Sequence, residues 1–364
     1  MKTSPAFLSM IISFRCLALF TGVAGCVLLP DLRAWDYEGH RMVNQIALAS
    51  LPADFPRFVH DGVQAERIMF LSGEPDRWRN VPDLVLKQSG GSWTDHFCDM
   101  EYIPEAGLDW ATVPSFRYDF IVQFAAGRAA HARNFAPIDP AKNADHTREW
   151  PGFAPWAIAE YFGKLRSGFS YLKVFEELGT ADEIANARSN LLYVMGVMGH
   201  YVGDCAQPLH TTKHHNGWVG DNPKGYTIWA GLHSWIDGGI TGKTGLRFPQ
   251  LAARVTAAQP IALGNRADAR DPMFVALVEY LLRQHRQVEP LYVLEKDGKL
   301  GQGDQPVSDE ARVFIETRLL EGGRMLGDIW LTAYRHAVAD NYLRAALIRR
   351  QTAGAPVPPT KAVP

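Results

Sequence analysis

Residues 199–237 begin with GHYVGDCAQPLH and end with GLHSWID. In this segment His200 and Asp204 are four residues apart, and His233 and Asp237 repeat the same step. On an α-helix, residues four apart lie one turn above each other on the same face. Each pair can therefore point at one metal ion, and two such pairs predict a site with more than one ion.

The first pair ends an apolar stretch, LLYVMGVMGHYVGD at residues 191–204, and His210 follows after a proline. One His-x-x-x-Asp pair by itself is more typical of a surface hydrogen bond or a satisfied core histidine. A carboxylate inside an apolar helix, however, has to be paired or to bind a metal. Imidazole and carboxylate donors without a thiolate favour zinc and leave iron and manganese open.

The composition sets limits on the class of protein. The chain has 364 residues and is 47% hydrophobic, which is enough for a substantial core in one or two domains. Its net charge of -2 argues against a basic nucleic-acid-binding face over the whole surface. An anionic substrate would need a local positive charge, and a metal cluster would supply it.

Apolar residues recur every three or four positions along most of the chain, which is the period of an amphipathic helix. Alternating runs typical of strands are nearly absent. We therefore expect an all-α fold, a single mainly helical catalytic domain over residues 35–350, followed by a Pro-rich, disordered tail at 351–364. Ser308, followed by two acidic residues, is a suitable helix N-cap. The helical segments are 39–51, 117–132, 155–179, 185–204, 272–286 and 308–350.

Three segments rich in Pro, Gly, Asp and Asn predict loops, at residues 80–95, 134–155 and 211–231. The last of these joins the two His/Asp pairs, and we expect it to fold as a hairpin over the site. His214 and His215 lie in it and are more typical of a solvated loop than of a substrate contact.

Residues 1–34 have the pattern of an export signal, with two basic residues, an apolar stretch of 15 residues and a small residue at the end. Cleavage after Ala34 would make Trp35 the amino terminus of a periplasmic or secreted protein. The alternative is a lipoprotein signal in which Cys26 becomes the anchored residue. No other apolar run approaches the about 20 residues that a transmembrane segment requires.

Further candidate ligands lie upstream of the central segment. Trp35 and His40 open the predicted mature chain, Asp76 lies in GEPDRWRN and His96 lies in TDHFCDMEY. Taken singly, each has an ordinary structural interpretation, as a core aromatic, a helix cap or a loop histidine. Together with the two pairs and the intervening histidine, they form a set of nine.

This set of nine resembles the ligand pattern of the zinc-dependent single-strand nucleases of fungi, plants and bacteria, which form one superfamily with bacterial phospholipase C. The resemblance spans residues 35–237 in pieces. It implies an all-helical domain with three zinc ions and an amino-terminal tryptophan that ligates through its amine and carbonyl groups. One ion would take Asp76, His96, His200 and Asp204; a second would share Asp204 and take His40 and Trp35; the third would take His210, His233 and Asp237.

Details of the pattern favour the nuclease branch. Trp35 and His40 are only five residues apart, whereas phospholipase C has a longer gap, and the last ligand is Asp237 where phospholipase C has Glu. The family also has Phe and Asp just after its loop histidine, and this chain has Phe97 and Asp99 there.

The sequence also departs from the family. The interval from His96 to His200 is much longer than in the fungal nucleases, which indicates an insertion that reshapes the cleft. Gly231 stands where the family has Asn, and Asp221 replaces the second glycine of a Gly-Gly-Asn element that ends at Asn222. These changes leave the metal chemistry intact and put the substrate preference in doubt.

The expected activity is that of a hydrolase, a zinc-dependent phosphodiesterase and endonuclease, in which a hydroxide shared by two zinc ions attacks phosphorus. Arg79 would offset charge on the phosphate, and Asp99 would orient the attacking water or accept its proton. Phe97 would stack on a base, with ordinary core packing as its alternative, and Asn222 would contribute to substrate binding.

The expected substrates are single-stranded DNA or RNA and, through removal of 3′ phosphates, nucleotides. A zinc-dependent phospholipase C is the alternative, and its choline head group would require an aromatic or acidic pocket. A non-enzymatic zinc carrier is a third possibility, although the chain lacks the His-rich tracts of such proteins. No stable protein partner is implied.

Cys98 and Cys205 remain in the predicted mature chain, and each lies within two residues of a candidate ligand. The two could form a disulfide in an oxidising compartment. Two free buried thiols are an equal alternative.

Overall fold

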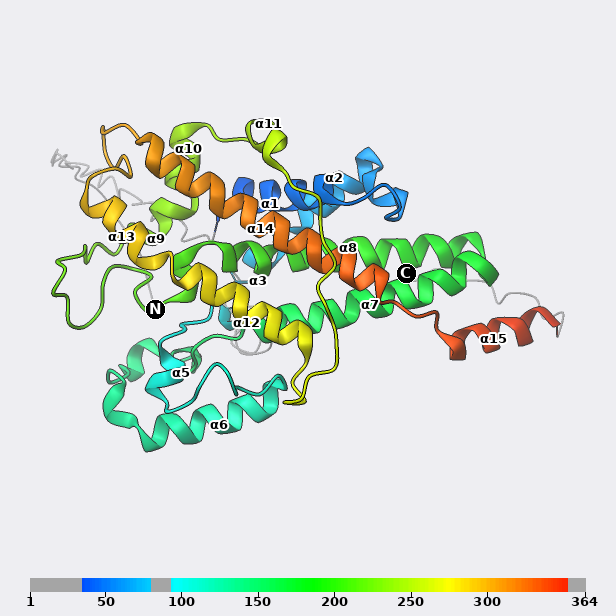
Figure 1. Cartoon of the computed structure of the whole chain (residues 1–364), viewed down its shortest axis with the longest axis horizontal. Helices are drawn as coiled ribbons and strands as arrows, with labels where there is room; N and C mark the ends of the chain where they lie inside the picture. Colours follow the sequence, from blue (N-terminus) through cyan, green and yellow to red (C-terminus); the bar gives the residue numbers. More distant parts are fainter. Residues whose placement is uncertain (1–34, 80–92, 353–364) are drawn as a thin grey trace, which may run out of the picture. The chain divides into compact units, whose positions relative to one another are not determined.

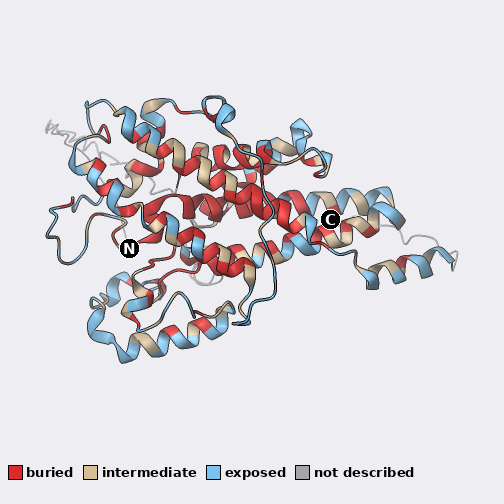
Figure 2. Cartoon of the chain, viewed as in Figure 1, coloured by how far each residue is buried: buried red, intermediate tan, exposed pale blue. Residues whose placement is uncertain are grey.

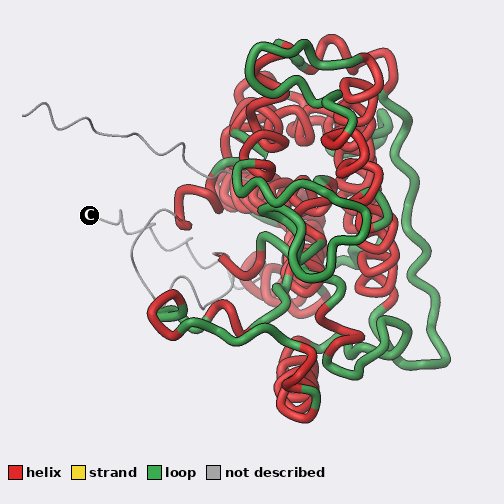
Figure 3. Tube along the Cα trace, turned by 90° about the vertical axis from the view of Figure 1, so that its left-hand side faces the viewer, coloured by secondary structure: helices red, strands yellow, loops and turns green. Residues whose placement is uncertain are grey.

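The computed structural model describes residues 35–79 and 93–352. Within these ranges the chain forms helices and loops and no β-strand, which confirms the all-α prediction (Figure 3). The predicted export signal at 1–34, most of the predicted loop at 80–95, and the tail from 353 onwards lie outside the described residues.

In the described part of the chain, six helices of 14 residues or more provide most of the fold (Figure 1). They are α1 (Tyr37–Ser50), α6 (Arg117–Ala130), α7 (Ala154–Leu178), α8 (Ala181–Ala206), α12 (Pro272–His285) and α14 (Asp309–Arg335). The shorter helices are α2 (Gly62–Leu71), α3 (Glu74–Arg79), α5 (Tyr102–Glu105), α9 (Leu232–Ser234), α10 (Ile240–Thr244), α11 (Phe248–Leu251), α13 (Val288–Lys296) and α15 (Asn341–Thr352).

Helix α8 is the central element of the fold, because it packs against α7, α14, α2 and α1. Its first half is largely exposed, whereas every residue from Met195 to Ala206 is buried. Figure 2 shows this change along the helix, from exposed near the junction with α7 to fully buried at the other end. The two metal-ligand candidates of α8 therefore lie in the interior.

The start of α8 follows local helix rules. The hydroxyl of Thr180 accepts a hydrogen bond from the backbone of Glu183, and the Glu183 carboxylate accepts one from the backbone of Thr180 in return. This reciprocal capping box satisfies two amide donors that the first turn would leave unpaired. Acidic residues in the same turn also interact favourably with the positive end of the helix dipole, which stabilises the helix.

Close packing in the buried half of α8 depends on glycine. A Cβ atom on Gly199 would lie 1.8 Å from Asn44 Oδ1 of α1, and one on Gly196 would lie 2.5 Å from Leu71 Cβ of α2. The amide of Asn44 donates to the carbonyls of Ile68 and Gly196 in the same contact. These contacts bring α1 and α2 close enough for their neighbouring side chains to approach the end of α8.

The C-terminal helices differ from the prediction of one continuous segment over 308–350. Ser308 caps α14 through the backbone of Ala311, as predicted, but α14 ends at Arg335 and α15 is separate. Lys173 of α7 donates to the backbone carbonyl of Ala337 just beyond the end of α14, and Asp340 accepts from the amide of Leu343 to start α15. The break is thus set by a side chain from a distant helix and by a second N-cap.

Residues 101–153 connect the segment that carries His96 to α7, within the interval where the resemblance predicts an insertion, and we call them the long insertion. It contains α5, α6 and short 3₁₀ turns at 132–134, 140–142 and 147–149. Two buried phenylalanines, Phe120 and Phe124, hold α6 to the rest of the fold, and most of its other residues are exposed or half-buried. The predicted loop at 134–155 is therefore an ordered segment with local turns. None of the described helices has the length and apolar character to cross a membrane.

Candidate metal centre

Eight of the nine side chains named from the sequence meet in three groups, in each of which the possible ligand atoms lie within 4.8 Å of one another. They come from α1, α3, the 93–99 segment, α8, a 3₁₀ turn at Pro208–Thr211 and the region around α9. The groups are His40, His200 and Asp204; Asp76, His96 and His200; and His210, His233 and Asp237.

The first two groups form one continuous cluster around α8, because they share His200. Asp204 faces three histidines with its two oxygens. Its Oδ1 lies 3.4 Å from His40 Nε2, and its Oδ2 lies 3.0 Å from His96 Nδ1 and 3.3 Å from His200 Nε2. This is the position that a bridging carboxylate would need, as the resemblance implied for Asp204.

Asp76, on α3, is the remaining member of this cluster. Its Oδ1 lies 3.8 Å from His200 Nε2 and 3.0 Å from the guanidinium of Arg79. Both side chains are only 10% exposed, so this ion pair lies at the edge of the cluster rather than in bulk solvent. Burial works against ionisation of Asp76, but His200 and Arg79 outweigh it and lower the pKa of the carboxyl below 3.8.

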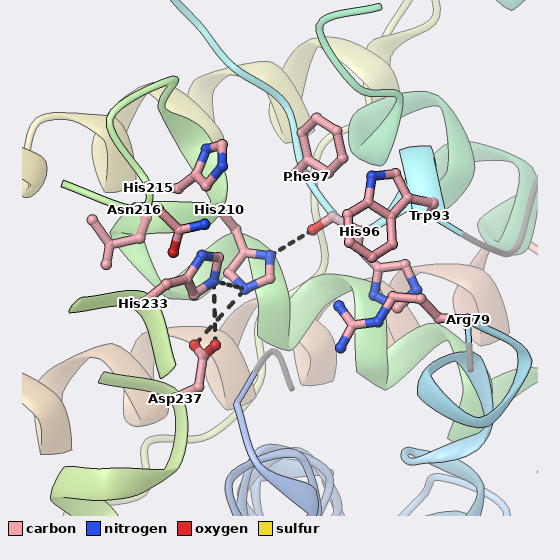
Figure 4. Close-up of a pocket in the computed structure, with 10 residues that line it drawn as sticks. Arg79, Trp93, His96, Phe97, His210, His215, Asn216, His233 and Asp237 are labelled. Carbon is pink, nitrogen blue, oxygen red and sulfur yellow. Dashed lines mark hydrogen bonds and ion pairs between the residues drawn. The ribbon is translucent and has the colours of Figure 1, made fainter. Parts of the chain in front are cut away.

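The third group lies beyond the end of α8. His210 Nε2 is 2.9 Å from His233 Nε2, and His233 Nε2 is 3.2 Å from Asp237 Oδ2 (Figure 4). His233 lies on α9, and Asp237 lies in a π-helical turn at Trp235–Gly239, so the four-residue step places both on one side as predicted. Gln207 donates to Asp237 Oδ1 at 2.8 Å and fixes the carboxylate.

Backbone carbonyls orient two of the imidazoles. His200 Nδ1 is 2.6 Å from the carbonyl of Ser72, and His210 Nδ1 is 2.8 Å from the carbonyl of His96. A carbonyl can only accept, so each Nδ1 carries the proton, and in the neutral ring Nε2 is left with a lone pair. Both Nε2 atoms face their clusters. Hydrogen bonds of this kind hold metal-binding histidines in the correct tautomer.

Two buried polar atoms without hydrogen-bond partners are a second reason why these residues fit bound cations. Among the described residues, His96 Nε2 and Asp204 Oδ1 are buried and have no hydrogen-bond partner. A buried polar atom left in this state is costly, whereas a metal ion would use its lone pair.

The pKa values of the clustered histidines are shifted in different directions. Burial lowers the pKa of His40 to about 3 and that of His96 to about 4, so both rings are neutral at pH 7 and able to ligate. Burial acts against protonation of His210 as well, but Asp204 and Asp237 outweigh it and raise its pKa to about 9. The carboxylates thus stabilise a proton on one ligand candidate, His210. A bound cation would take the place of that proton.

Trp35 lies beside these groups. Its indole is fully buried and donates to the carbonyl of Gly203 at 2.8 Å, and the next residue, Asp36, donates its amide to the carbonyl of Asp237 at 2.9 Å. Trp35 is therefore tied to α8 through its side chain and to the third group through the amide of the next residue. Ligation by its amine requires cleavage after Ala34, which lies outside the described residues, and stays a prediction.

A cavity of about 120 Å³ opens onto the third group (Figure 4). Besides the histidines, it is lined by Arg79 and by two aromatic rings, Phe97 and Trp93. The guanidinium of Arg79 lies 5.4 Å from the centre of the Trp93 ring. Arg79 and Phe97 therefore lie beside the third group, and their contacts with substrate stay a prediction.

The other two predicted site residues lie elsewhere. Asp99 is buried and lines an adjoining cavity on the far side of Phe97, and it belongs to none of the three groups. Burial, followed by the charge of Glu101, raises its pKa well above 3.8. Both polar ends of the Asn222 amide bind the backbone of Tyr226, at 2.7 and 2.8 Å, so Asn222 closes a turn. Its role in substrate binding is not supported by this position.

Several residues of the site were not found from the sequence. Trp93 and Asn216 line the cavity, and no spacing rule marked them. His215, for which the sequence favoured a solvated loop over a substrate contact, is half-buried and lines the cavity too. His214 is buried and stacks on Trp218 at 3.9 Å between ring centres, so its assignment to a solvated loop was wrong. Gln207, which holds Asp237, could have been identified from the sequence. It lies three residues before the ligand candidate His210, at the start of the same short turn.

The predicted hairpin over the site is a loop without strands. It folds back on itself through one backbone hydrogen bond, from Trp218 to Thr227 at 2.8 Å. Cys98 and Cys205 are both buried and free in the structure, which corresponds to the second of the two alternatives for these thiols.

Comparison with known proteins adds no relative: no family model, no curated protein and no solved structure matches this chain. Membership of the nuclease family therefore stays a prediction that rests on the nine residues. The geometry described above is independent of that resemblance.

Proposed function

We propose that the protein is a metal-dependent phosphodiesterase that hydrolyses single-stranded nucleic acid. One observation carries this proposal: the third histidine and aspartate group, His96 of the second group, an arginine and two aromatic rings line the same small cavity. Cation-binding groups, a phosphate-binding side chain and base-stacking surfaces are the three components that such a substrate requires.

The side chains of the cavity divide these tasks. Arg79 presents a planar set of donors that matches phosphate oxygens, and its pairing with Asp76 holds it beside the clusters. Divalent cations held by the eight clustered side chains would supply Lewis acidity to the phosphoryl group and acidify a water molecule. Gln207 and the Ser72 and His96 carbonyls keep the ligand candidates in place before substrate arrives.

Phe97 and Trp93 favour an unpaired strand over a duplex. Both rings line the cavity, and an aromatic ring can stack on any base that is not already stacked in a helix. Such a contact contributes about 1–3 kcal/mol per base and does not depend on sequence. Duplex DNA would have to be opened before its bases reached these rings.

Zinc is the ion that this proposal assigns, in three sites, because the donors are imidazole and carboxylate groups without thiolate. The amine of Trp35 would complete one site after cleavage at Ala34. We expect protein that begins at Trp35 to exceed protein with any preceding residue by at least about tenfold in activity. Equal activity of the two forms, with the amino termini verified by mass spectrometry, would exclude a role for the amine.

The deciding experiment compares substrates on one preparation. Zinc-loaded protein is assayed on single-stranded DNA, duplex DNA, RNA and phosphatidylcholine, and its metal content is measured by elemental analysis. We expect cleavage of the single strands, little cleavage of the duplex and three zinc ions per chain. Preferential cleavage of phosphatidylcholine would identify a phospholipase C instead. Bound zinc without any turnover would identify a metal carrier.

A further inference from the structure

A second cavity, of about 240 Å³, adjoins the one at the metal centre. Trp93, Phe97 and His215 line both, so the two cavities lie side by side and share these three side chains. The far wall of the second cavity comes from the long insertion, through Lys142, Arg148 and Trp150 among others. We call this second space the extension cleft.

The insertion is firmly joined to the segment that carries His96. The amide of Asp99 donates to the carbonyl of Pro151 at 2.6 Å, and the amide of Phe153 donates to the carbonyl of Thr94 at 2.6 Å. Gly152 has a φ of 93°, and a Cβ there would lie 2.1 Å from the Phe97 carbonyl oxygen. Only glycine permits this approach, so the wall of the extension cleft has a fixed position relative to the metal centre.

A compact turn presents Arg148 to the cleft. The side-chain oxygen of Asn143 accepts from the backbone of Arg148 at 3.1 Å, and Arg148 Nε donates to the carbonyl of Lys142 at 2.7 Å. The other end of the Asn143 amide donates to Glu149 at 3.0 Å. These bonds use one guanidinium nitrogen. Within residues 35–79 and 93–352, the two terminal nitrogens of Arg148 make no hydrogen bond or ion pair.

Two basic side chains, Lys142 and Arg148, line the cleft together with the carboxyl groups of Asp99 and Asp145. Lys142 approaches Asp139 only at 3.8 Å, with both side chains more than half exposed, so solvent screens that pair. Asp145, on the same wall, accepts two hydrogen bonds from Thr147, which hold its carboxylate within the turn. An arginine with open donors beside an aromatic ring, next to a site that fits phosphate chemistry, matches the chemistry of a nucleotide.

We propose that the extension cleft binds the nucleotide adjacent to the scissile phosphate, with Arg148 and Lys142 holding its phosphate group and Trp150 stacking on its base. This inference rests on the proposed function and makes it more specific: the preferred substrate is a polymer that spans both cavities, and a mononucleotide reaches only the first. The long insertion would then set the choice of substrate and leave the metal chemistry to the clusters.

A binding measurement tests this without turnover. Metal-free protein is titrated into a fluorescent single-stranded oligonucleotide, and the wild type is compared with Arg148→Ala and Arg133→Ala. Arg133 is exposed, belongs to the same insertion and lines neither cavity, so it is a matched charge control. We expect Arg148→Ala to bind about tenfold more weakly and to lower the salt slope by about 0.7, the value for one phosphate contact to a single strand.

A conservative variant separates charge from folding. Arg148→Lys keeps the positive charge and removes the Nε bond to the turn. We expect it to retain most of the affinity and the salt slope. If Arg148→Lys and Arg148→Ala lose affinity equally, or if Arg133→Ala loses as much as Arg148→Ala, the arginine has no specific phosphate contact and the inference is wrong.

Kinetics distinguish this inference from the proposed function. The ratio of kcat/KM for an oligonucleotide to kcat/KM for bis(p-nitrophenyl) phosphate, a small diester, should fall about tenfold in Arg148→Ala and stay constant in Arg133→Ala. If the zinc-loaded wild type hydrolyses neither compound, the proposed function itself is wrong. If it hydrolyses both and the ratio is the same in all variants, the proposed function stands and the extension cleft is not a subsite.

Discussion

The two ends of helix α8 are stabilised in different ways. At the N-terminal end, the Thr180 capping box and an ion pair between Glu183 and Arg350 of α15 lie at the surface. At the C-terminal end, His200 and Asp204 are completely buried in a cluster of titratable groups. One helix therefore joins a region built from local, solvent-exposed interactions to a region that encloses charge.

This difference indicates where bound cations matter. Exposed pairs such as Glu183 and Arg350 are screened by water and contribute little each. The buried carboxylates are removed from bulk solvent. At Asp204 burial acts against ionisation but His200 and His210 outweigh it and lower the pKa well below 3.8, whereas burial raises the pKa of Asp237 to about 6. We therefore expect changes at the C-terminal end of α8 to affect metal content, activity and stability together, and changes at the N-terminal end to affect stability alone.

The largest effect should come from Asp204→Asn. This change keeps the size of the side chain and removes the charge that faces His40 and His96, so we expect loss of bound zinc and a fall in kcat/KM of about a thousandfold or more. The control is Asp182→Asn, in the exposed first turn of the same helix, which should leave both quantities unchanged. Elemental analysis and an assay on single-stranded DNA measure them. Full activity in Asp204→Asn would refute the central role of the cluster.

Metal removal should have the next largest effect. Ions that bind only the folded state add their binding free energy to its stability, so we expect a chelator to lower the Tm by about 10 °C. Calorimetry or circular dichroism checks this, and zinc should restore the Tm. Asp204→Asn should respond far less to the chelator than Asp182→Asn. A chelator that leaves the Tm of the wild type unchanged would show that folding and metal binding are not linked.

The pH dependence of the stability of the metal-free protein should be a smaller effect than metal removal. It should have an acid limb and an alkaline limb. The pKa of His210 is raised to about 9 from its ordinary 6.5, so its contribution to stability is present below pH 6.5 and is lost as the pH rises through about 9. The pKa of His96 is lowered to about 4, so its contribution is present above pH 6.5 and is lost as the pH falls through about 4.

Zinc should remove the alkaline limb, because a cation replaces the proton on His210. Measuring Tm from pH 4 to pH 9, with and without zinc, gives both limbs. Identical alkaline behaviour of the two forms would contradict a metal ligand role for His210.

The smallest effect is expected at the N-terminal end of α8. Arg350, ahead of the Thr180 backbone bond, lowers the pKa of Glu183 to about 2. The contribution of this pair is therefore present above pH 4.5 and is lost as the pH falls through about 2. Arg350→Ala should lower the Tm at pH 7 by only about 1–2 °C, because the pair is partly exposed, and should not change metal content. A loss of zinc in this variant would mean that the two ends of α8 are coupled.

The sequence alone determined the features that depend on neighbours along the chain. The apolar period predicted the long helices, and the cap at Ser308 was correct. The four-residue step placed His233 and Asp237 on one side of a helical turn, because that geometry follows from the backbone itself. The nine candidate ligands could be selected from the sequence, and eight of them meet in space.

Only the tertiary structure decided how these pieces combine. Contacts between distant segments make His200 common to two groups and place Trp93 and His215 at the cavity. They also place residues 142–150 along the extension cleft. The break after α14 likewise depends on Lys173 of α7. Hydrogen-bonding rules within one helix act over four residues and can be read from the sequence, whereas side-chain packing across more than 100 residues is fixed only once the whole core forms.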